Sequence, residues 1–301
     1  MKNIDLHMHT QYSDGEYTVE TVLRKCEEAG LSIISITDHD SVEAYKEIEK
    51  NSKIREIFSG RIIEGTELSF NKDGHLFDVL GYGIDYKKMQ KILDNRMNES
   101  ARKKKQEILL EEFKEVCRKK GIKFDNSIKT NKGTKSEAFN LLFEDISNFE
   151  KYPENQIFIK YISKTNIAVF YKEFFSNPNS DFFVNEARFL PSLKESIDII
   201  HECGGKAFLA HSFAYGLQDT ISFINYAINE GIDGIEQYYS TFTNEQENII
   251  KELAEKKSLL ISGGTDFHGP NIKPGIDLGI GKGNMKIPES IILDWTINRY
   301  L

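Results

Sequence analysis

Histidines and carboxylates recur at the ends of apolar segments along this chain. His7 and His9 form an H-x-H pair after the apolar stretch near the N-terminus, and Asp266 and His268 form a D-x-H pair after the segment SLLISG. Side chains two residues apart on an extended strand point to the same face, so each pair can present two ligands to one spot. Imidazoles and carboxylates that converge in this way are typical ligands of transition-metal ions.

Four more residues of the ligand type stand at comparable positions. His39 lies in TDHD after a β-branched run, Glu67 ends another apolar segment, His211 follows KAFLA, and Asp14 lies close behind the first pair. A lone histidine beside a strand is usually structural, as we expect for His201 inside a predicted helix. Five histidines and three carboxylates at independent strand ends instead favour a metal site, and their number favours two or three ions.

The elements that must position these residues alternate between strands and helices. Periodicity and turn residues predict strands over 3–8, 31–37, 61–69, 75–82, 206–210, 232–237 and 258–263. They predict helices over 18–30, 41–50, 193–203, 218–230 and 243–257. Asp40 with Glu43, and Ser192 with Glu195, have the spacing of capping boxes at two of the helix starts. This alternation indicates an α/β fold with a parallel sheet, and about seven strands are consistent with a TIM-like barrel.

The stretch from about residue 90 to residue 190 breaks the alternation. Residues 90–120 are predicted to form a long, strongly charged helix, and residues 124–190 are expected to be irregular. We therefore expect a barrel made of residues 1–89 and 191–301, with residues 90–190 inserted as a mainly helical cap subdomain.

Composition narrows the class of protein. The 301 residues include 39 Lys and Arg against 47 Asp and Glu, a net charge of −8, which argues against a mainly electrostatic grip on nucleic acid. No apolar run reaches the roughly 18 residues of a membrane span, and the N-terminus has no signal-peptide pattern. Three scattered cysteines make no disulfide framework. We expect a cytoplasmic protein without a membrane partner.

Six segments together resemble the polymerase and histidinol phosphatase (PHP) superfamily, especially its small bacterial metal-dependent phosphoesterases. They are DLHMHTQYSDG, TDHD, GTELS, LGYGID, FLAHS and SGGTDFHG, spread over residues 4–85 and 204–280. The resemblance implies a distorted (β/α)7 barrel with up to three metal ions at its mouth.

The resemblance also implies which residues hold each ion. The first ion would be held by His7, His9, Glu67 and Asp266. Glu67 would bridge to a second ion, which His211 also binds. Asp14, His39 and His268 would hold the third. The ions would be two or three divalent cations, manganese, zinc or iron, with magnesium as an alternative.

Two departures from the family pattern bear on the site. Asp78 stands where family members usually have a histidine that completes the second site, and a carboxylate there would shift metal preference towards manganese or magnesium. His75 is the alternative ligand, but on a regular strand it would face the other side, so we favour Asp78. The phosphate-binding arginine segment of close relatives is missing. Arg188, Lys132 and Lys135 are the candidate substrate-phosphate contacts.

These residues predict metal-assisted hydrolysis of a phosphate ester. Two ions about 3.5–4 Å apart can lower the pKa of a shared water towards ~7, and the resulting hydroxide would attack phosphorus. Asp266 or His211 would accept the proton, and Glu67 would bridge the ions. The expected substrate is a small phosphorylated molecule with a phosphomonoester, such as a nucleotide or a nucleoside bisphosphate.

Three alternatives remain open. The first is an exonuclease that acts on short single-stranded nucleic acid and stacks bases on the aromatic residues of 139–183. The second is a histidinol-phosphatase-like activity. The third is a non-catalytic metal-binding module, and the replacement of the usual histidine by Asp78 is the only feature that favours it.

Overall fold

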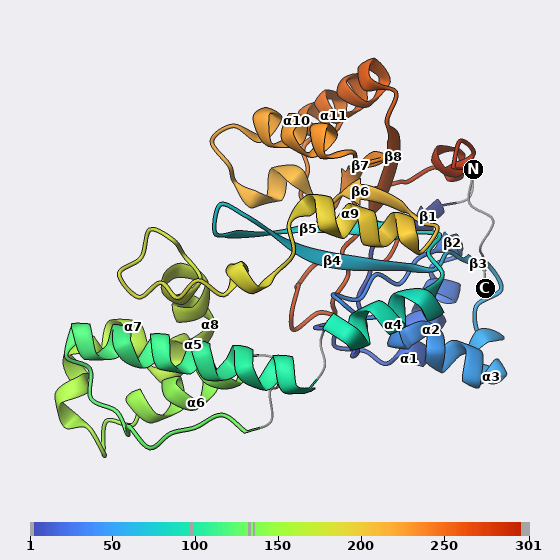
Figure 1. Cartoon of the computed structure of the whole chain (residues 1–301). Coiled ribbons are helices and arrows are strands. Elements are labelled where there is room, and N and C mark those ends of the chain that lie inside the picture. The colour runs from blue at the N-terminus through green and yellow to red at the C-terminus, as the bar shows by residue number, and fades with distance from the viewer. Residues whose placement is uncertain (1–2, 97–98, 132–133, 135, 296–301) are drawn as a thin grey trace. The chain divides into compact units, whose positions relative to one another are not determined.

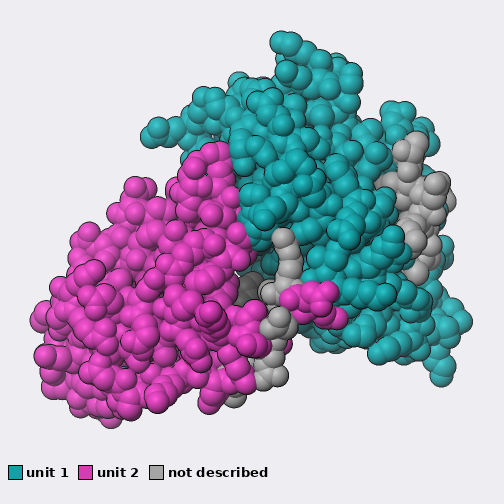
Figure 2. All heavy atoms as spheres, in the orientation of Figure 1, with its two compact units in different colours: residues 1–70, 77–93, 191–301 teal, residues 71–76, 94–190 magenta. Residues whose placement is uncertain are grey.

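The computed structural model describes residues 3–96, 99–131, 134 and 136–295, which fall into two compact units (Figure 2). Unit 1 comprises Met1–Phe70, Phe77–Leu93 and Pro191–Leu301, and unit 2 comprises Asn71–Leu76 and Asp94–Leu190. Unit 1 contains all the strand ends that carry predicted metal ligands.

Two sheets form the framework of unit 1 (Figure 1). The three-stranded sheet has the order β1 (Asn3–Asp5), β2 (Leu31–Ile34), β3 (Arg61–Ile62), and all its pairs are parallel. The five-stranded sheet has the order β4 (Gly65–Lys72), β5 (His75–Tyr82), β6 (Lys206–Leu209), β7 (Gly234–Tyr239), β8 (Leu260–Gly264). The chain is therefore of the mixed α/β class, with parallel strands in both sheets.

The second sheet is not wholly parallel, contrary to expectation. β6, β7 and β8 pair in parallel, but β5 and β6 are antiparallel. β4 and β5 are neighbours joined only by Asp73 and Gly74, whose φ values are 53° and 86°. Two central residues with positive φ make a tight hairpin turn, and so short a link cannot join parallel strands.

Backbone hydrogen bonds beyond the two sheets bring the strand ends of unit 1 together. Leu6 N–H donates to the carbonyl of Gly263 at 3.1 Å, and Asp266 N–H donates to that of His7 at 2.8 Å, which links the chain after β1 to the chain around β8. Asp40 N–H donates to the carbonyl of Glu67 at 2.8 Å and links the chain after β2 to β4.

Helices of unit 1 connect these strands. They are α1 (Val19–Glu28), α2 (Glu43–Lys50), α3 (Ser52–Arg55), α4 (Tyr86–Arg96), α9 (Leu193–Glu202), α10 (Thr220–Glu230) and α11 (Asn244–Lys257). The predicted capping box of Ser192 and Glu195 is confirmed at the start of α9. The one predicted from Asp40 is wrong: Asp40 has a φ of 48°, its N–H bonds to β4, and α2 begins only at Glu43 without a side-chain cap.

Apolar side chains fill the space between strands and helices in unit 1. The inward face of α1 consists of Val19, Val22, Leu23 and Cys26, all fully buried, as a helical spacing of apolar residues requires. A second apolar cluster contains Trp295, the one tryptophan of the chain, whose ring lies 4.6 Å from that of Phe208.

Unit 2 is mainly helical. It contains α5 (Glu99–Lys120), α6 (Glu137–Ile146), α7 (Ile159–Ile162) and α8 (Ile167–Val169), with short helical turns η1 (Pro153–Phe158), η2 (Lys164–Asn166), η3 (Phe170–Phe175) and η4 (Ala187–Phe189). The helix expected over 90–120 is thus two helices, α4 and α5, and the stretch 124–190 is more regular than expected. Of the described residues, none belongs to a helix long and apolar enough to cross a membrane.

Phenylalanine rings make the core of unit 2. Phe113, Phe139, Phe143, Phe170 and Phe175 are all at most 4% exposed. The rings of Phe139 and Phe175 lie 4.8 Å apart, and those of Phe113 and Phe139 lie 5.9 Å apart. These rings pack against one another, so they are not available as platforms for stacking bases.

Candidate metal centre

Five histidines and four carboxylates converge in unit 1, most of them just beyond the ends of strands and two, Glu67 and Asp78, within β4 and β5. Their ligand atoms fall into four groups, and within each group all the atoms lie within 4.8 Å of one another. The nine residues, which we call the ligand cluster, are His7, His9, Asp14, His39, Glu67, Asp78, His211, Asp266 and His268. The structure therefore brings together every residue that the sequence favoured as a metal ligand, whereas His75, the alternative to Asp78, is not among them.

Glu67 is fully buried at the middle of the ligand cluster. It is the third residue of β4 and so lies near the start of that strand, not at a strand end as expected, because the predicted strand 61–69 is divided into β3 and β4. Its Oε1 lies 3.0 Å from His211 Nε2, and its Oε2 lies 3.1 Å from His7 Nε2 and 3.2 Å from His9 Nε2. Burial alone raises the pKa of Glu67, but the positive charges of His7 and His39 outweigh it and hold the pKa well below its usual range. One carboxylate thus faces several histidines with both of its oxygens.

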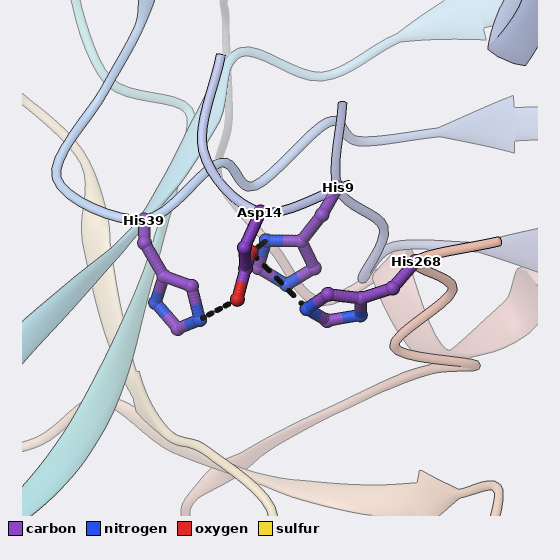
Figure 3. Close-up of side chains that lie close together, drawn as sticks. All are labelled: His9, Asp14, His39 and His268. Carbon is purple, nitrogen blue, oxygen red and sulfur yellow. Dashed lines mark ion pairs between the residues drawn. The ribbon is translucent and has the colours of Figure 1, made fainter. Parts of the chain in front are cut away.

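Asp14 is the centre of a second group (Figure 3). Its Oδ1 lies 3.2 Å from His268 Nε2 and 3.6 Å from His9 Nδ1, and its Oδ2 lies 3.9 Å from His39 Nε2. Burial opposes ionisation, but the hydrogen bond from His268 and the charge of His39 lower the pKa of Asp14. The Asp14 side chain is 44% exposed, so this group lies where the ligand cluster meets solvent.

Asp266 and Asp78 complete the other two groups. Asp266 Oδ1 lies 3.2 Å from His9 Nε2, and its Oδ2 accepts a hydrogen bond of 2.7 Å from Tyr239. Asp78 Oδ1 accepts a hydrogen bond of 2.8 Å from Ser69 and lies 3.9 Å from His39 Nδ1. Burial, together with the negative charge of Glu67, raises the pKa of Asp78 to about 7.

The hydrogen bonds of three histidines test whether this arrangement fits metal ions. His7 Nδ1 lies 2.9 Å from a carboxylate oxygen of Glu236, and His268 Nδ1 lies 2.9 Å from the carbonyl oxygen of Asp266. Both partners only accept, so each Nδ1 carries a hydrogen. His9 Nδ1 lies 3.3 Å from Ser13 Oγ, whose hydroxyl donates to Asp38 and therefore accepts from His9.

With Nδ1 protonated, the Nε2 lone pair of each of these three histidines points at a carboxylate. Two electron-rich groups face each other stably only when a proton or a cation lies between them. Burial lowers the pKa of His9, but the carboxylates of Asp266 and Glu67 outweigh it and raise the pKa to about 9, so a proton fills this place in the ion-free protein. Divalent cations suit the same places, and the donor set fits them.

Backbone conformation also aims two of the ligands. His211 and Asp266 have φ values of 24° and 55°, which residues other than glycine rarely adopt. Each residue lies two positions after the end of β6 or β8, so a sharp turn there directs its side chain into the ligand cluster. Such conformations cost energy and persist where the surrounding structure holds them.

Three residues that contact the ligand cluster were not predicted from the sequence: Glu236, Tyr239 and Lys273. Glu236, in β7, is fully buried and accepts hydrogen bonds from His7 Nδ1 and, at 2.7 Å, from the backbone N–H of His211. A carboxylate within the predicted strand 232–237, directly after the apolar Ile235, was a signal that could have found it. Nothing in the spacing marks Tyr239 or Lys273, which both contact Asp266.

The residues predicted to contact the substrate phosphate are not among the residues of the ligand cluster. Arg188 belongs to unit 2, where its Nη1 lies 2.7 Å from Glu112 Oε1. Lys132 and Lys135 lie outside the described residues. His75, the alternative to Asp78, is exposed at the start of β5, and His201 on α9 hydrogen-bonds to Asp233 at 2.7 Å, as a structural histidine would.

Comparison with known proteins extends this picture. The chain is 26% identical over 302 residues to a 5'-3' exoribonuclease of Haemophilus influenzae, with 98% of each chain covered. It is 32% identical over 85 residues to a 3',5'-nucleoside bisphosphate phosphatase of Chromobacterium violaceum, which covers 28% of this chain and 29% of the relative.

A solved structure shares the fold. A protein from Bifidobacterium adolescentis, assigned as a metal-dependent phosphoesterase, superposes with a TM-score of 0.62 at 19% identity, covering 97% of this chain and 94% of that one. The family model of the PHP domain matches residues 5–177, more than half of the chain. The resemblance seen in the sequence is thereby confirmed, and the chain belongs to the PHP domain family.

Proposed function

We propose that this protein hydrolyses phosphate esters of RNA or of nucleotides at the ligand cluster of unit 1. That it is a metal-dependent phosphoesterase, a hydrolase of phosphoric esters, follows from its family and its relatives. The observation that carries the proposal is the convergence of nine ligand side chains in one place.

The proposed ion sites divide the nine residues of the ligand cluster among them. Two or three divalent cations would be held, one by His7, His9, Glu67 and Asp266, one by Glu67, His211 and Asp78, and one by Asp14, His39 and His268. The contacts of Glu67 with histidines on both of its oxygens support its role as a bridging ligand. Asp78 adds an oxygen donor, and oxygen donors suit manganese or magnesium.

The chemistry of such a site is hydrolysis. Bound divalent cations would lower the pKa of water and neutralise charge on the phosphoryl oxygens. Asp266 is the proposed proton acceptor, because Tyr239 holds its Oδ2 while its Oδ1 faces the histidines. His211, whose Nε2 lies 3.0 Å from Glu67, is the alternative acceptor. Glu236 holds both His7 and His211 in place.

Two substrate classes are supported by separate observations. The full-length match to a 5'-3' exoribonuclease favours stepwise cleavage of short RNA from its 5' end, and we place this activity first. The local match to a nucleoside bisphosphate phosphatase favours removal of one phosphate from a small nucleotide, which was the activity expected first from the sequence. Both use the same ligands and differ in what the rest of the site must accommodate.

The architecture of unit 1 is part of the proposal. We take its two sheets as parts of one distorted (β/α)7 barrel, which the hydrogen bonds between the chain segments around β1 and β8 support. Unit 2 would be the insertion that adapts this barrel to its substrate.

The deciding experiment measures metal content and product release together. Manganese-loaded protein is given a 5'-phosphorylated RNA 12-mer labelled at its 3' end, a nucleoside 3',5'-bisphosphate and histidinol phosphate. Progressive shortening of the RNA supports the exoribonuclease, and inorganic phosphate from the bisphosphate supports the phosphatase. His9→Ala should lose metal and activity, whereas His201→Ala should keep both. Turnover of neither the RNA nor the bisphosphate by metal-loaded protein would refute the proposal, even if histidinol phosphate were hydrolysed.

A further inference from the structure

The loop that follows β8 brings an ammonium group to the ligand cluster. Lys273 Nζ forms an ion pair with Asp266 Oδ2, on the side of that carboxylate that also receives the Tyr239 hydroxyl. The Lys273 side chain is 31% exposed and that of Asp266 is 4% exposed. The positive charge therefore lies where the buried ligands meet solvent, which is where a substrate must enter.

This lysine is delivered by an anchored turn. Lys273 N–H donates to the carbonyl of Gly269 at 2.9 Å, and Asn271 donates from Nδ2 to Glu16 Oε1 at 2.5 Å and from its backbone to Oε2 at 3.2 Å. Glu16 N–H in turn donates to the carbonyl of His268 at 2.7 Å. The turn is thus fastened to the segment that carries Asp14, two residues before Glu16.

Gly269 makes this turn possible. Its φ is 103°, and a Cβ there would come within 2.5 Å of the Glu16 carboxylate. Only glycine adopts this conformation without strain and leaves room for the Glu16 side chain. The placement of Lys273 therefore depends on specific residues of the loop and does not rest on the long side chain alone.

Charge and reach suit this ammonium to phosphate. An ammonium on a flexible four-carbon stem is a compact charge that binds phosphate oxygens with strong, charge-assisted hydrogen bonds. Asp266 presents Oδ1 to the histidines and Oδ2 to Lys273, so a phosphoryl group held beside Asp266 would lie within reach of the ammonium. Arg188, by contrast, belongs to unit 2 and forms an ion pair with Glu112 there.

We propose that Lys273 binds a non-bridging oxygen of the phosphoryl group that is cleaved, and so supplies the basic substrate contact of unit 1. The inference deepens the proposed function and rests on it. It names the recognised group as a phosphate held against Asp266, shared by an RNA 5' end and a nucleotide.

The test is calorimetric titration of manganese-loaded, full-length protein with inorganic phosphate. Lys273→Ala should weaken phosphate binding at least about 10-fold, Lys273→Arg should stay within about 3-fold of the unchanged protein, and Lys282→Ala, at an exposed lysine of the same unit, should have no effect. Metal content, measured on the same samples, should be equal in all four proteins.

Two results would overturn this inference. One is phosphate binding by Lys273→Ala as tight as that of the unchanged protein. The other is loss of metal together with phosphate, because the lysine would then only position Asp266. Turnover assays on the same samples separate the two proposals. Absent turnover with Lys273-dependent phosphate binding would refute the proposed function alone, and normal turnover with Lys273-independent binding would refute only the role of Lys273.

Discussion

The two units of this protein differ in what they bury beside aliphatic side chains. Unit 1 encloses, in addition to its apolar core, a cluster of charged residues that includes His7, Glu67 and Asp266, whereas the core of unit 2 is dominated by phenylalanine rings. Buried charges cost free energy unless each finds a partner of opposite sign, while buried rings contribute free energy directly. Unit 1 thus depends on protons or cations that the chain itself does not contain, and unit 2 does not.

The largest expected effect is on metal binding and activity. It should follow from a change to a buried carboxylate of unit 1 and not from the same change in unit 2. Glu67→Gln removes the charge that faces His7, His9, His39 and His211, so we expect loss of bound metal and a fall in activity of more than about 100-fold. Glu137→Gln changes a buried carboxylate in unit 2 and should leave both unchanged. Metal analysis and initial rates measure the difference, and equal rates for the two variants would contradict it.

A substitution in the aromatic core of unit 2 should lower the stability of unit 2 alone. Phe139→Ala removes a ring that packs against Phe113, Phe143 and Phe175, which should lower the free energy of unfolding of unit 2 by about 3–5 kcal/mol. Metal content and the fluorescence of Trp295, which reports on unit 1, should stay the same. Phe189→Ala, at a ring 37% exposed, is the matched control. Helical circular dichroism during urea unfolding gives the measurement.

Metal removal should separate the stabilities of the two units. A ligand present at about 100 times its dissociation constant stabilises the folded state by about 2.7 kcal/mol. Chelation should therefore lower the unfolding temperature seen by Trp295 fluorescence and leave the transition of unit 2 in place. A scanning calorimeter trace that shifts as a whole on chelation would show that the units unfold together.

A smaller effect is expected from a residue that holds ligands in place. Glu236→Gln keeps the size of the side chain but places an amide where two N–H groups donate, so one of the bonds to His7 and His211 is lost. Removing such a partner typically weakens metal binding 10- to 100-fold. Glu64→Gln, at another buried carboxylate of unit 1, should bind metal normally. Competition with a fluorescent chelator measures the affinities.

The smallest effect concerns pH. Because the pKa of Asp78 is raised from 3.8 to about 7, this group favours the ion-free folded state most below its ordinary pKa, and that contribution is lost as pH rises through about 7. Metal binding needs the carboxylate ionised, so the share of metal affinity due to Asp78 should rise up to about 10-fold per pH unit below 7 and level off above it. Asp78→Asn should show a shallower rise, and parallel curves for the two proteins would contradict this.

How far the sequence could predict these features depends on where each residue sits. His7, His9, Asp266 and His268 were identifiable because side chains two apart after a strand share a face. Glu236 and Tyr239 belong to β7 itself, where a local pattern does not show which face meets the ligand cluster. Lys273 is placed by Gly269 through contacts with a residue more than 250 positions away, which no local periodicity records.

Prediction of the fold from local sequence patterns meets the same limit. Strand and helix positions followed from periodicity and capping, as at Ser192, but the direction of β5 did not, because the two-residue turn after β4 overrides the parallel arrangement that alternation suggests. Asp40 has the right spacing for a helix cap, but its backbone N–H donates to the carbonyl of Glu67 in β4 and it does not cap α2. In both cases a tertiary contact decides between local options.

The ligand cluster draws on residues from His7 to His268, and this spread has a consequence for a chain still being made. At roughly 5–20 residues per second, on the order of ten to fifty seconds separate synthesis of the first ligand from that of the last. During that interval the aromatic core of unit 2 is already complete, while the early histidines lack Asp266 and His268. A chain that ended before β8 would lack Asp266 and His268 and could not assemble the full centre, so tight metal loading would mark a molecule synthesised beyond His268.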